Sequence, residues 1–217
     1  MMELRPDNVA EWDPDLFTPQ DTQPDTLFYA EPRRVAHIDA EAIGIVTNLY
    51  RELLPAGGAL LDVMSSWRSH LPTGVNYSRV VGVGMNLEEM RDNPQLTEHV
   101  MHDLNASPRL PYADHEFDAA CCAVSAQYLQ KPAEVFREVG RVLKPGAPFV
   151  ISYSNRCFPT KAISLWLETN DDEHGDLIAL YFAAAGNWSE AVRRDCRTMK
   201  AKVFRADPLY AVWAYAQ

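Results

Sequence analysis

Short apolar segments alternate with amphipathic helical patterns along most of the chain, and this alternation limits the fold more than any other feature. The segments GGALLDVM, RVVGVGM, EHVMHDL, FDAACCAV and APFVISYS have the length and apolar content of strands. Amphipathic patterns lie between them, the clearest over residues 131–146, which ends in Lys-Pro-Gly. Because each helix carries the chain back across the sheet, the pattern predicts an α/β fold with a mostly parallel sheet and helices on both faces.

Two polar residues mark expected helix starts in the first half of the chain. Asp39 is expected to cap a helix that runs through Leu54. Asn86 is followed three residues later by Glu89, which resembles a capping box. Residues 1–25 are acidic and rich in proline and are expected to be irregular, which leaves residues 26–217 as a single domain.

The C-terminal third predicts an antiparallel edge to the sheet. Helical patterns over 160–168 and 173–184 are followed by AKVFRAD and LYAVWAYA, which have the pattern of two strands. Asp207-Pro208 between them favours a turn. An antiparallel terminal strand on an otherwise parallel sheet is common in this fold class.

Composition excludes several classes of function. The chain has 217 residues, 20 basic and 30 acidic, so its formal net charge of −10 argues against non-specific binding to nucleic acid or to anionic membranes. No segment has the pattern of a signal peptide or a membrane span, which predicts a cytoplasmic protein. Cys121 and Cys122 are expected on opposite faces of a strand as buried thiols. His99 and His102 have no companion at ligand spacing, so no metal site is predicted, and the oligomeric state stays open.

The segment DVMSSW, residues 62–67, lies where such a sheet binds its ligands. Ligands of open α/β sheets sit beyond the carboxyl ends of the strands, where a helix start offers free N–H groups. The segment contains no glycine; Ser65 and Ser66 offer hydroxyl donors, while Met64 and Trp67 restrict close approach of the backbone to a ligand. It therefore predicts a polar binding site of unusual composition.

At this point the chain resembles the class I S-adenosylmethionine-dependent methyltransferases of the type 11 kind. The resemblance rests on LLDVMSS, VVGVGMNLEEM, the run from Leu110 to Leu129, and EVFREVGRVLKPGAPFVISYSN, and covers roughly residues 58–155. It implies a Rossmann-like fold with a seven-stranded, mostly parallel sheet. It also implies that the protein binds S-adenosylmethionine, with S-adenosylhomocysteine as the product, and acts on a small molecule. The glycine-free loop places the chain in a divergent branch.

The resemblance assigns cofactor roles by position. Asp62 and the loop Met64, Ser65 and Ser66 match the positions that hold the amino-acid end of the cofactor. The acid that grips the ribose is absent, because its position is Gly84; Met85 is then expected against the adenine and Asn86 near the ribose. Asp103 and the backbone of Leu104 match the adenine contacts, and Val124 and Ser125 lie where the fourth strand opens onto the methyl group. From the residues alone, Asp62, Asp103 and Asn86 are also explained as capping residues, and Trp67 as core packing.

Substrate contacts are expected after the fourth and fifth strands, and no catalytic residue is identified. The candidates are Gln127, Tyr128, Asn155, Arg156 and Lys161, of which the two cations suit a carboxylate or a phosphate. The segment LFYAEPRRVAHID is aromatic and basic in an acidic chain. It is expected either to fold over the cofactor, with Tyr29 in contact and Arg33 on the cofactor carboxylate, or to pack on the core as a surface strap.

Two other functions stay open. One is a catalytically silent binding or interaction protein with a methyltransferase-like fold. The other is a nucleotide dehydrogenase, which the RVLKPG segment before the fifth strand disfavours because that segment is typical of the methyltransferases.

Overall fold

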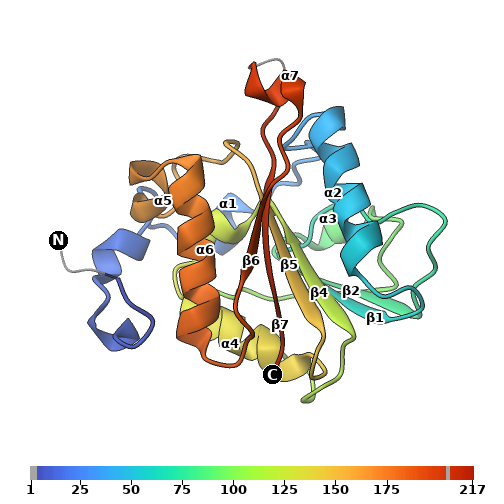
Figure 1. Ribbon diagram of the computed structural model, residues 1–217, viewed down its shortest axis with the longest axis horizontal. Coiled ribbons are helices and arrows are strands. Elements are labelled where there is room, and N and C mark those ends of the chain that lie inside the picture. Colours follow the sequence, from blue (N-terminus) through green and yellow to red (C-terminus); the bar gives the residue numbers. More distant parts are fainter. Residues whose placement is uncertain (1–3, 204–205) are drawn as a thin grey trace.

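Seven strands form one sheet in the computed structural model, which describes residues 4–203 and 206–217. The strand order is β3-β2-β1-β4-β5-β7-β6, and β7 runs antiparallel to both of its neighbours while the first five strands run parallel (Figure 1). The predicted fold class is therefore confirmed. The strands are β1 Ala59–Val63, β2 Arg79–Gly84, β3 Glu98–Met101, β4 Ala119–Ala123, β5 Pro148–Tyr153, β6 Val192–Asp195 and β7 Tyr210–Tyr215.

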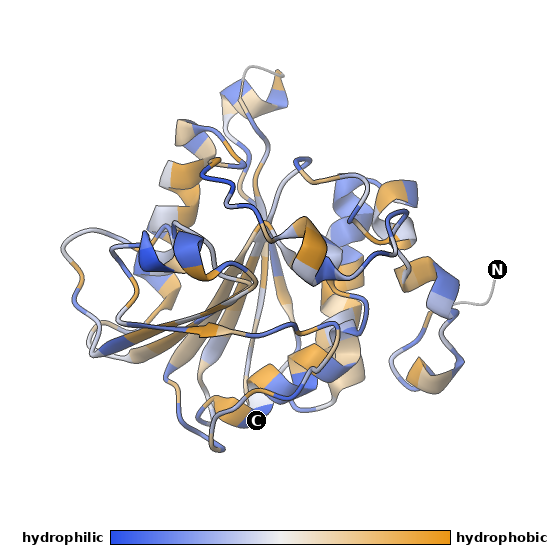
Figure 2. Ribbon diagram, turned by 180° about the vertical axis from the view of Figure 1, so that it is seen from behind, coloured by the Kyte–Doolittle hydropathy of each residue, from blue (hydrophilic) through white to orange (hydrophobic). Residues whose placement is uncertain are grey.

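Helices cover both faces of the sheet and divide the core into two apolar clusters. On one face α2 (Ala40–Leu53) contacts β5 and buries Val46 and Tyr50 in a cluster with residues of β1, β4 and β5. On the other face α4 (Pro132–Val142) and α6 (Asp171–Ala185) pack together and bury Phe136 and Phe182. The turns of α4, beside the C-terminus, alternate between orange and blue in Figure 2, as expected for an amphipathic helix. The α-helices are α1 Asp25–Phe28, α2 Ala40–Leu53, α3 Leu87–Arg91, α4 Pro132–Val142, α5 Ser164–Glu168, α6 Asp171–Ala185 and α7 Met199–Lys202.

Local sequence signals placed several of these elements correctly. The side chain of Asp39 caps α2 by accepting from the Ala42 N–H at 2.9 Å. Asn86 caps α3 by accepting from the Glu89 N–H at 3.0 Å. Cys121 packs in one core cluster and Cys122 in the other, which confirms that neighbouring residues of this strand face opposite sides of the sheet.

The predicted strand over residues 201–207 is wrong. Residues 199–202 form α7, and residues 204–205 lie outside the described part of the chain. The strand that pairs with the outer edge of β7, opposite β5, is β6, whose four residues are all exposed. Because β6 buries no face, its sequence lacks the alternation of apolar and polar residues by which a strand is detected.

The N-terminal segment is more ordered than its composition suggested. Two short 3₁₀ helices, Val9–Glu11 and Pro14–Phe17, lie before α1. Trp12 stacks on Phe17 with ring centroids 5.4 Å apart, and both rings contact Tyr181 of α6. This segment is thereby packed onto the domain by aromatic contacts. Within residues 4–203 and 206–217, no helix is long and apolar enough to cross a membrane.

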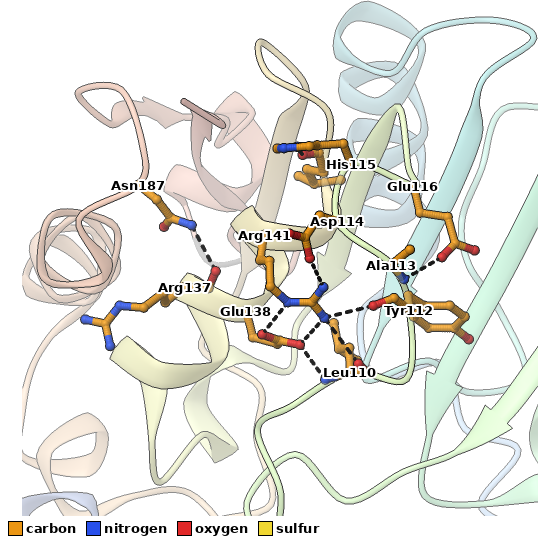
Figure 3. A network of polar contacts seen from close by, with 11 residues as sticks. Leu110, Tyr112, Ala113, Asp114, His115, Glu116, Arg137, Glu138, Arg141 and Asn187 are labelled. Carbon is orange, nitrogen blue, oxygen red and sulfur yellow. Dashed lines mark hydrogen bonds and ion pairs between the residues drawn. The ribbon is translucent and has the colours of Figure 1, made fainter.

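A polar network explains the most specific part of the sequence resemblance. Arg141 of α4 donates to the carbonyls of Leu110 and Tyr112 and pairs with Glu138 and Asp114 (Figure 3). Glu138 in turn accepts from the Leu110 N–H at 2.8 Å. These contacts fasten the loop before β4 to α4, so this part of the motif is structural, and none of residues 110–116 lines the cavity at the strand ends.

Candidate functional site

A cavity of about 120 Å³ lies at the carboxyl ends of β1, β2 and β4. All eleven residues expected from the sequence to contact a cofactor line it: Tyr29, Arg33, Asp62, Met64, Ser65, Ser66, Met85, Asn86, Asp103, Leu104 and Ser125. The strand ends and the loops that follow them form the floor. The segment of residues 25–37, which we call the strap, contributes six residues and forms the roof.

The glycine-free loop after β1 has a backbone conformation that glycine favours. Met64 has a φ of 59°, in the left-handed region. An L-residue in this region costs roughly 1–2 kcal/mol, so the loop keeps a glycine-like shape at the expense of local strain. The loop packs on β2, where the Ser65 N–H donates to the Val83 carbonyl at 2.7 Å. Gly84 lies directly against the Ser65 carbonyl, so the position where the family has an acid has no room for a side chain.

Asp62 at the end of β1 is buried and holds this loop in place. Its Oδ2 accepts from the Ser65 and Ser69 hydroxyls, each at 2.6 Å, and Oδ1 lies 3.7 Å from the Cys121 Sγ. Burial raises the pKa of Asp62 to about 6, although the three donors oppose the rise. The carboxylate is thus poorly solvated and gains free energy from any cation that approaches it.

Glu89 is a cavity residue that the sequence reasoning did not include among the site residues. Its carboxylate, buried in the first turn of α3, accepts from the Ser66 hydroxyl at 2.6 Å and from the Arg33 backbone N–H of the strap. The capping-box pattern had assigned its side chain to the helix end. The structure instead shows it linking the loop after β1 to the strap, so only the backbone of Glu89 takes part in the cap.

Side chains outside the strap hold it in place by hydrogen bonds to its backbone carbonyls. The Asn86 amide donates to the carbonyls of Tyr29, at 2.8 Å, and Ala30, at 3.2 Å. The Trp67 indole donates to the Val35 carbonyl at 3.1 Å, so Trp67 is a strap contact in addition to any packing role. Asn86 therefore caps α3 with its oxygen and holds the strap with its nitrogen.

Lys161, expected from the sequence to contact substrate, does not line the cavity. Its ammonium is buried and lies 3.1 Å from the Asp25 carboxylate and 3.3 Å from that of Asp21. It also donates to the carbonyls of Asp21 and Gln23. These partners give Lys161 a structural role, which is to anchor the start of the strap. Asn105 donates a further hydrogen bond to the Asp25 carboxylate at 3.0 Å.

The other substrate candidates are divided among different places. Tyr128 lines the cavity; its hydroxyl accepts from the Phe158 N–H at 2.8 Å, and burial raises its pKa to about 12. Gln127 is buried outside the cavity and donates to the Val124 carbonyl. Asn155 and Arg156 line a separate hollow near α7, where Arg156 pairs with Asp207 at 2.8 Å. Sequence order placed these residues after the right strands but did not show which way the loops turn.

Asp103 keeps one carboxylate oxygen free within the described residues. Both of its hydrogen bonds, from the N–H groups of Asn105 and Ala106, end on Oδ1. The capping interpretation is therefore correct for Oδ1. Oδ2 remains able to accept a hydrogen bond from a ligand in the cavity.

Strain and uncharged imidazoles mark the remaining walls. Val124, just after β4, has a φ of 43°, which is rare for a β-branched residue and concentrates at functional sites. Burial lowers the pKa of His37, and lowers that of His70 to about 4, so both rings are uncharged at neutral pH. Either can accept a proton but neither contributes a positive charge.

Comparisons with known proteins agree with this geometry. A family model described as a methyltransferase domain matches residues 66–151. Demethylmenaquinone methyltransferases from Renibacterium salmoninarum and Paenarthrobacter aurescens are 24% and 26% identical to the chain, over 70% and 76% of its length. The chain spans 60% of the length of each of these relatives.

Solved structures share the fold at low identity. An S-adenosylmethionine-dependent methyltransferase from Aquifex aeolicus matches with a TM-score of 0.56 and 18% identity, over 95% of this chain and all of that one. The cyclase SpnF matches with a TM-score of 0.58 and 18% identity, over 93% of each chain. The family match and the fold confirm the resemblance derived from the sequence. Because a cyclase shares the fold, the fold alone does not fix the reaction.

Proposed function

We propose that this chain, which carries a type 11 methyltransferase domain on a class I methyltransferase fold, binds S-adenosylmethionine and methylates a small molecule. The observation that carries the proposal is the convergence of the eleven cofactor candidates on one cavity at the carboxyl ends of the strands. When bound, S-adenosylmethionine supplies an electrophilic methyl group that an acceptor displaces in line.

Charge supports this choice of ligand. The cavity walls over β1, β2 and β3 carry the carboxyl groups of Asp62, Glu89 and Asp103. The amino-acid end of the cofactor carries an ammonium group and would lie near Asp62, so binding would relieve the desolvated carboxylate of Asp62, while Asp103 offers an acceptor to the neutral nucleoside end. Ser65, Ser66 and Met64 are proposed to surround the amino-acid end, and Asn86 and Met85 the nucleoside.

The chain's own residues would then position the reacting groups. Asp103 Oδ2 is proposed to accept from the exocyclic amine of adenine, with the Leu104 N–H beside it. Ser125, next to the strained Val124, is proposed to lie at the methyl end. An acceptor that must lose its proton would need a base, and the uncharged His37 lines the cavity and is able to accept that proton.

Binding requires the strap to move. Ligand cavities for molecules of this size usually measure about 300–1,000 Å³, and the present cavity is smaller at about 120 Å³. Asn86 and Trp67 donate hydrogen bonds to the strap, Glu89 accepts one from it, and exposed ion pairs join Arg34 of the strap to α3 and to Asp92 just after it. Each hydrogen bond contributes only about 1 kcal/mol net, so the free energy needed to open the strap is small compared with the binding free energy of a cofactor.

The alternative is a silent protein with this fold, and one observation favours it. The polar atoms of Asn86 and Glu89 that face the cavity are already bonded to the strap. In that case the strap permanently fills part of the nucleoside site.

Calorimetric titration with S-adenosylhomocysteine decides between the two. We expect binding with a Kd from about 1 to 100 μM in the wild type, and about tenfold weaker binding for Asp103→Asn because Asn keeps the Oδ1 cap but replaces the free acceptor. S-inosylhomocysteine serves as the matched ligand, because it has an acceptor oxygen in place of the adenine amine, so Asp103→Asn should bind it at least as tightly as the wild type does. A folded wild type that binds nothing at millimolar ligand rejects the proposal in favour of the silent protein.

A further inference from the structure

We infer that the half of the cavity over β4 and β5 recognises a carboxylate on a flat, apolar body, with Arg33 as the recognition residue. The inference rests on the proposed function, because it assigns this half of the cavity to the methyl acceptor; it moves Arg33 and Tyr29 from the cofactor candidates to the acceptor site and leaves the other nine with the cofactor. Its basis is the position, the free donors and the surroundings of one guanidinium group.

Arg33 lines the cavity with its backbone held at Glu89 and its guanidinium near Phe28 and Phe158. Its backbone N–H is fixed to Glu89, which follows β2. Its guanidinium lies 4.1 Å from the ring centroid of Phe28 and 5.7 Å from that of Phe158, which follows β5. In the sheet order β4 lies between β1 and β5, so the Phe158 ring near the cation follows a strand that is not adjacent to the one whose loop is proposed to hold the amino-acid end of the cofactor.

The guanidinium has unused hydrogen-bond donors. Its one hydrogen bond within the described residues runs from Nη1 to the Phe28 carbonyl, and within the same residues it makes no ion pair. The neighbouring Arg34 differs, because it pairs with both Glu88 and Asp92. A guanidinium stacked on aromatic rings keeps its N–H edge free, and that edge matches the two oxygens of a carboxylate.

The charge around this half of the cavity favours an anion. Asp25 is the carboxylate on this side, and it is paired with the buried Lys161 at 3.1 Å and bonded to Asn105. The carboxyl groups of Asp62 and Asp103 follow β1 and β3 on the other side, and that of Glu89, which follows β2, is already occupied by the Ser66 hydroxyl and the Arg33 backbone N–H. Charge is therefore distributed unevenly in the cavity, so that one half is suited to a cation and the other half to an anion.

Aromatic rings determine the shape of the ligand's body. Phe158 stacks on Tyr128 with centroids 6.1 Å apart, and it contacts Phe28 and His37 edge to face. Tyr29 completes this wall from the strap and contacts Phe28. Rings held in place by one another offer fixed flat surfaces, which favour a planar conjugated ligand over a flexible aliphatic one.

The test uses benzoate as the probe. Benzamide is the neutral control ligand and acetate is the non-aromatic control ligand. Dissociation constants are measured by protein-observed NMR, with and without S-adenosylhomocysteine. We expect the wild type to bind benzoate at least tenfold more tightly than it binds benzamide or acetate. Arg33→Gln should lose this preference, Arg33→Lys should keep part of it, and Arg34→Gln should keep all of it. All variants retain the backbone bond to Glu89, and their thermal midpoints check folding.

Three outcomes overturn the inference without touching the proposed function. The first is equal binding of benzoate and benzamide by the wild type. The second is unchanged benzoate binding in a folded Arg33→Gln. The third is a loss of affinity for S-adenosylhomocysteine in Arg33→Gln that is absent for methylthioadenosine, which lacks the amino-acid end; that result would assign Arg33 to the cofactor carboxylate. Failure of the wild type to bind S-adenosylhomocysteine rejects the proposed function instead.

Discussion

Gly84 of β2 faces the Ser65 carbonyl so closely that a Cβ on Gly84 would lie 2.2 Å from the carbonyl oxygen. Gly82, two residues earlier, has a similar relation to the Ser65 hydroxyl and to Leu96. The loop after β1 contains no glycine, but it approaches the neighbouring strand because that strand supplies the glycines. This arrangement also explains why an acid cannot occupy position 84.

Gly84→Ala should therefore destabilise the protein by about 1–3 kcal/mol, the usual cost of forcing a methyl group into a packed site. Gly44→Ala is the matched control, because Gly44 is exposed in α2 with nothing within 4 Å of its Cβ position. The control should gain about 1 kcal/mol from helix propensity. Urea denaturation of the three proteins measures both effects. Equal stability of Gly84→Ala and wild type would show that the loop does not pack as described.

Gly84→Asp should not improve cofactor affinity, for the same steric reason.

Met64→Gly should be more stable than Met64→Ala by about 1 kcal/mol. Both variants lose the packing of the Met64 side chain, but only glycine adopts a φ of 59° without strain. The usual order at a position with negative φ is the reverse, because glycine has more conformational entropy in the unfolded chain. The comparison thus isolates the backbone strain of the loop. If alanine is the more stable of the two, the loop is not in the left-handed conformation.

Asp62 should give the protein a stability that falls as the pH rises from 4 to 6. Its pKa is about 6 in the folded chain against an ordinary value of 3.8, mainly because of burial. The folded state keeps the proton over this window while the unfolded state has lost it, so the contribution is full below pH 4 and is lost as the pH passes 6. The difference in pKa corresponds to about 3 kcal/mol.

Asp62→Asn removes this titration, so the stability difference between wild type and variant is the quantity to measure. It should shift by about 3 kcal/mol against the wild type between pH 4 and pH 7 in urea denaturation. Taking the difference cancels the other acids, such as Asp39 and Glu52, whose lowered pKa values give slopes of opposite sign. A difference that does not change with pH would mean that Asp62 is ionised normally.

Asn86→Asp should loosen the strap and leave α3 intact. Aspartate caps a helix as well as asparagine does, but it lacks the amide donor that holds the Tyr29 and Ala30 carbonyls. Trypsin cleavage after Arg33 and Arg34 should accelerate about tenfold, since the lost bonds are worth about 1–2 kcal/mol. Asn170→Asp is the control, because Asn170 caps α6 and, within residues 4–203 and 206–217, its side chain forms hydrogen bonds only to the first turn of that helix. Equal cleavage rates in the two variants would leave Asn86 with its capping role only.

The sequence by itself determined the elements whose signals are local. The cap at Asp39, the buried strands and the amphipathic α4 could be predicted because side-chain period and capping chemistry act within a few residues. The same logic failed at β6, since an edge strand with both faces exposed carries no period. The family resemblance, rather than local pattern, supplied the residues expected at the cavity floor, and they gather there because parallel strands bring their carboxyl ends to one edge of the sheet.

Only the tertiary structure decided which groups meet across that edge. Glu89 and Asn86 follow the same strand, and no local pattern shows that both hold a strap 56 or 57 residues earlier in the chain. Lys161 and Arg33 are both cations in loops. Lys161 forms ion pairs with Asp21 and Asp25, whereas Arg33 keeps free hydrogen-bond donors among aromatic rings. The physical reason is that ion pairs and ring contacts between distant segments depend on where the loops turn, and this follows from the packing of the whole chain.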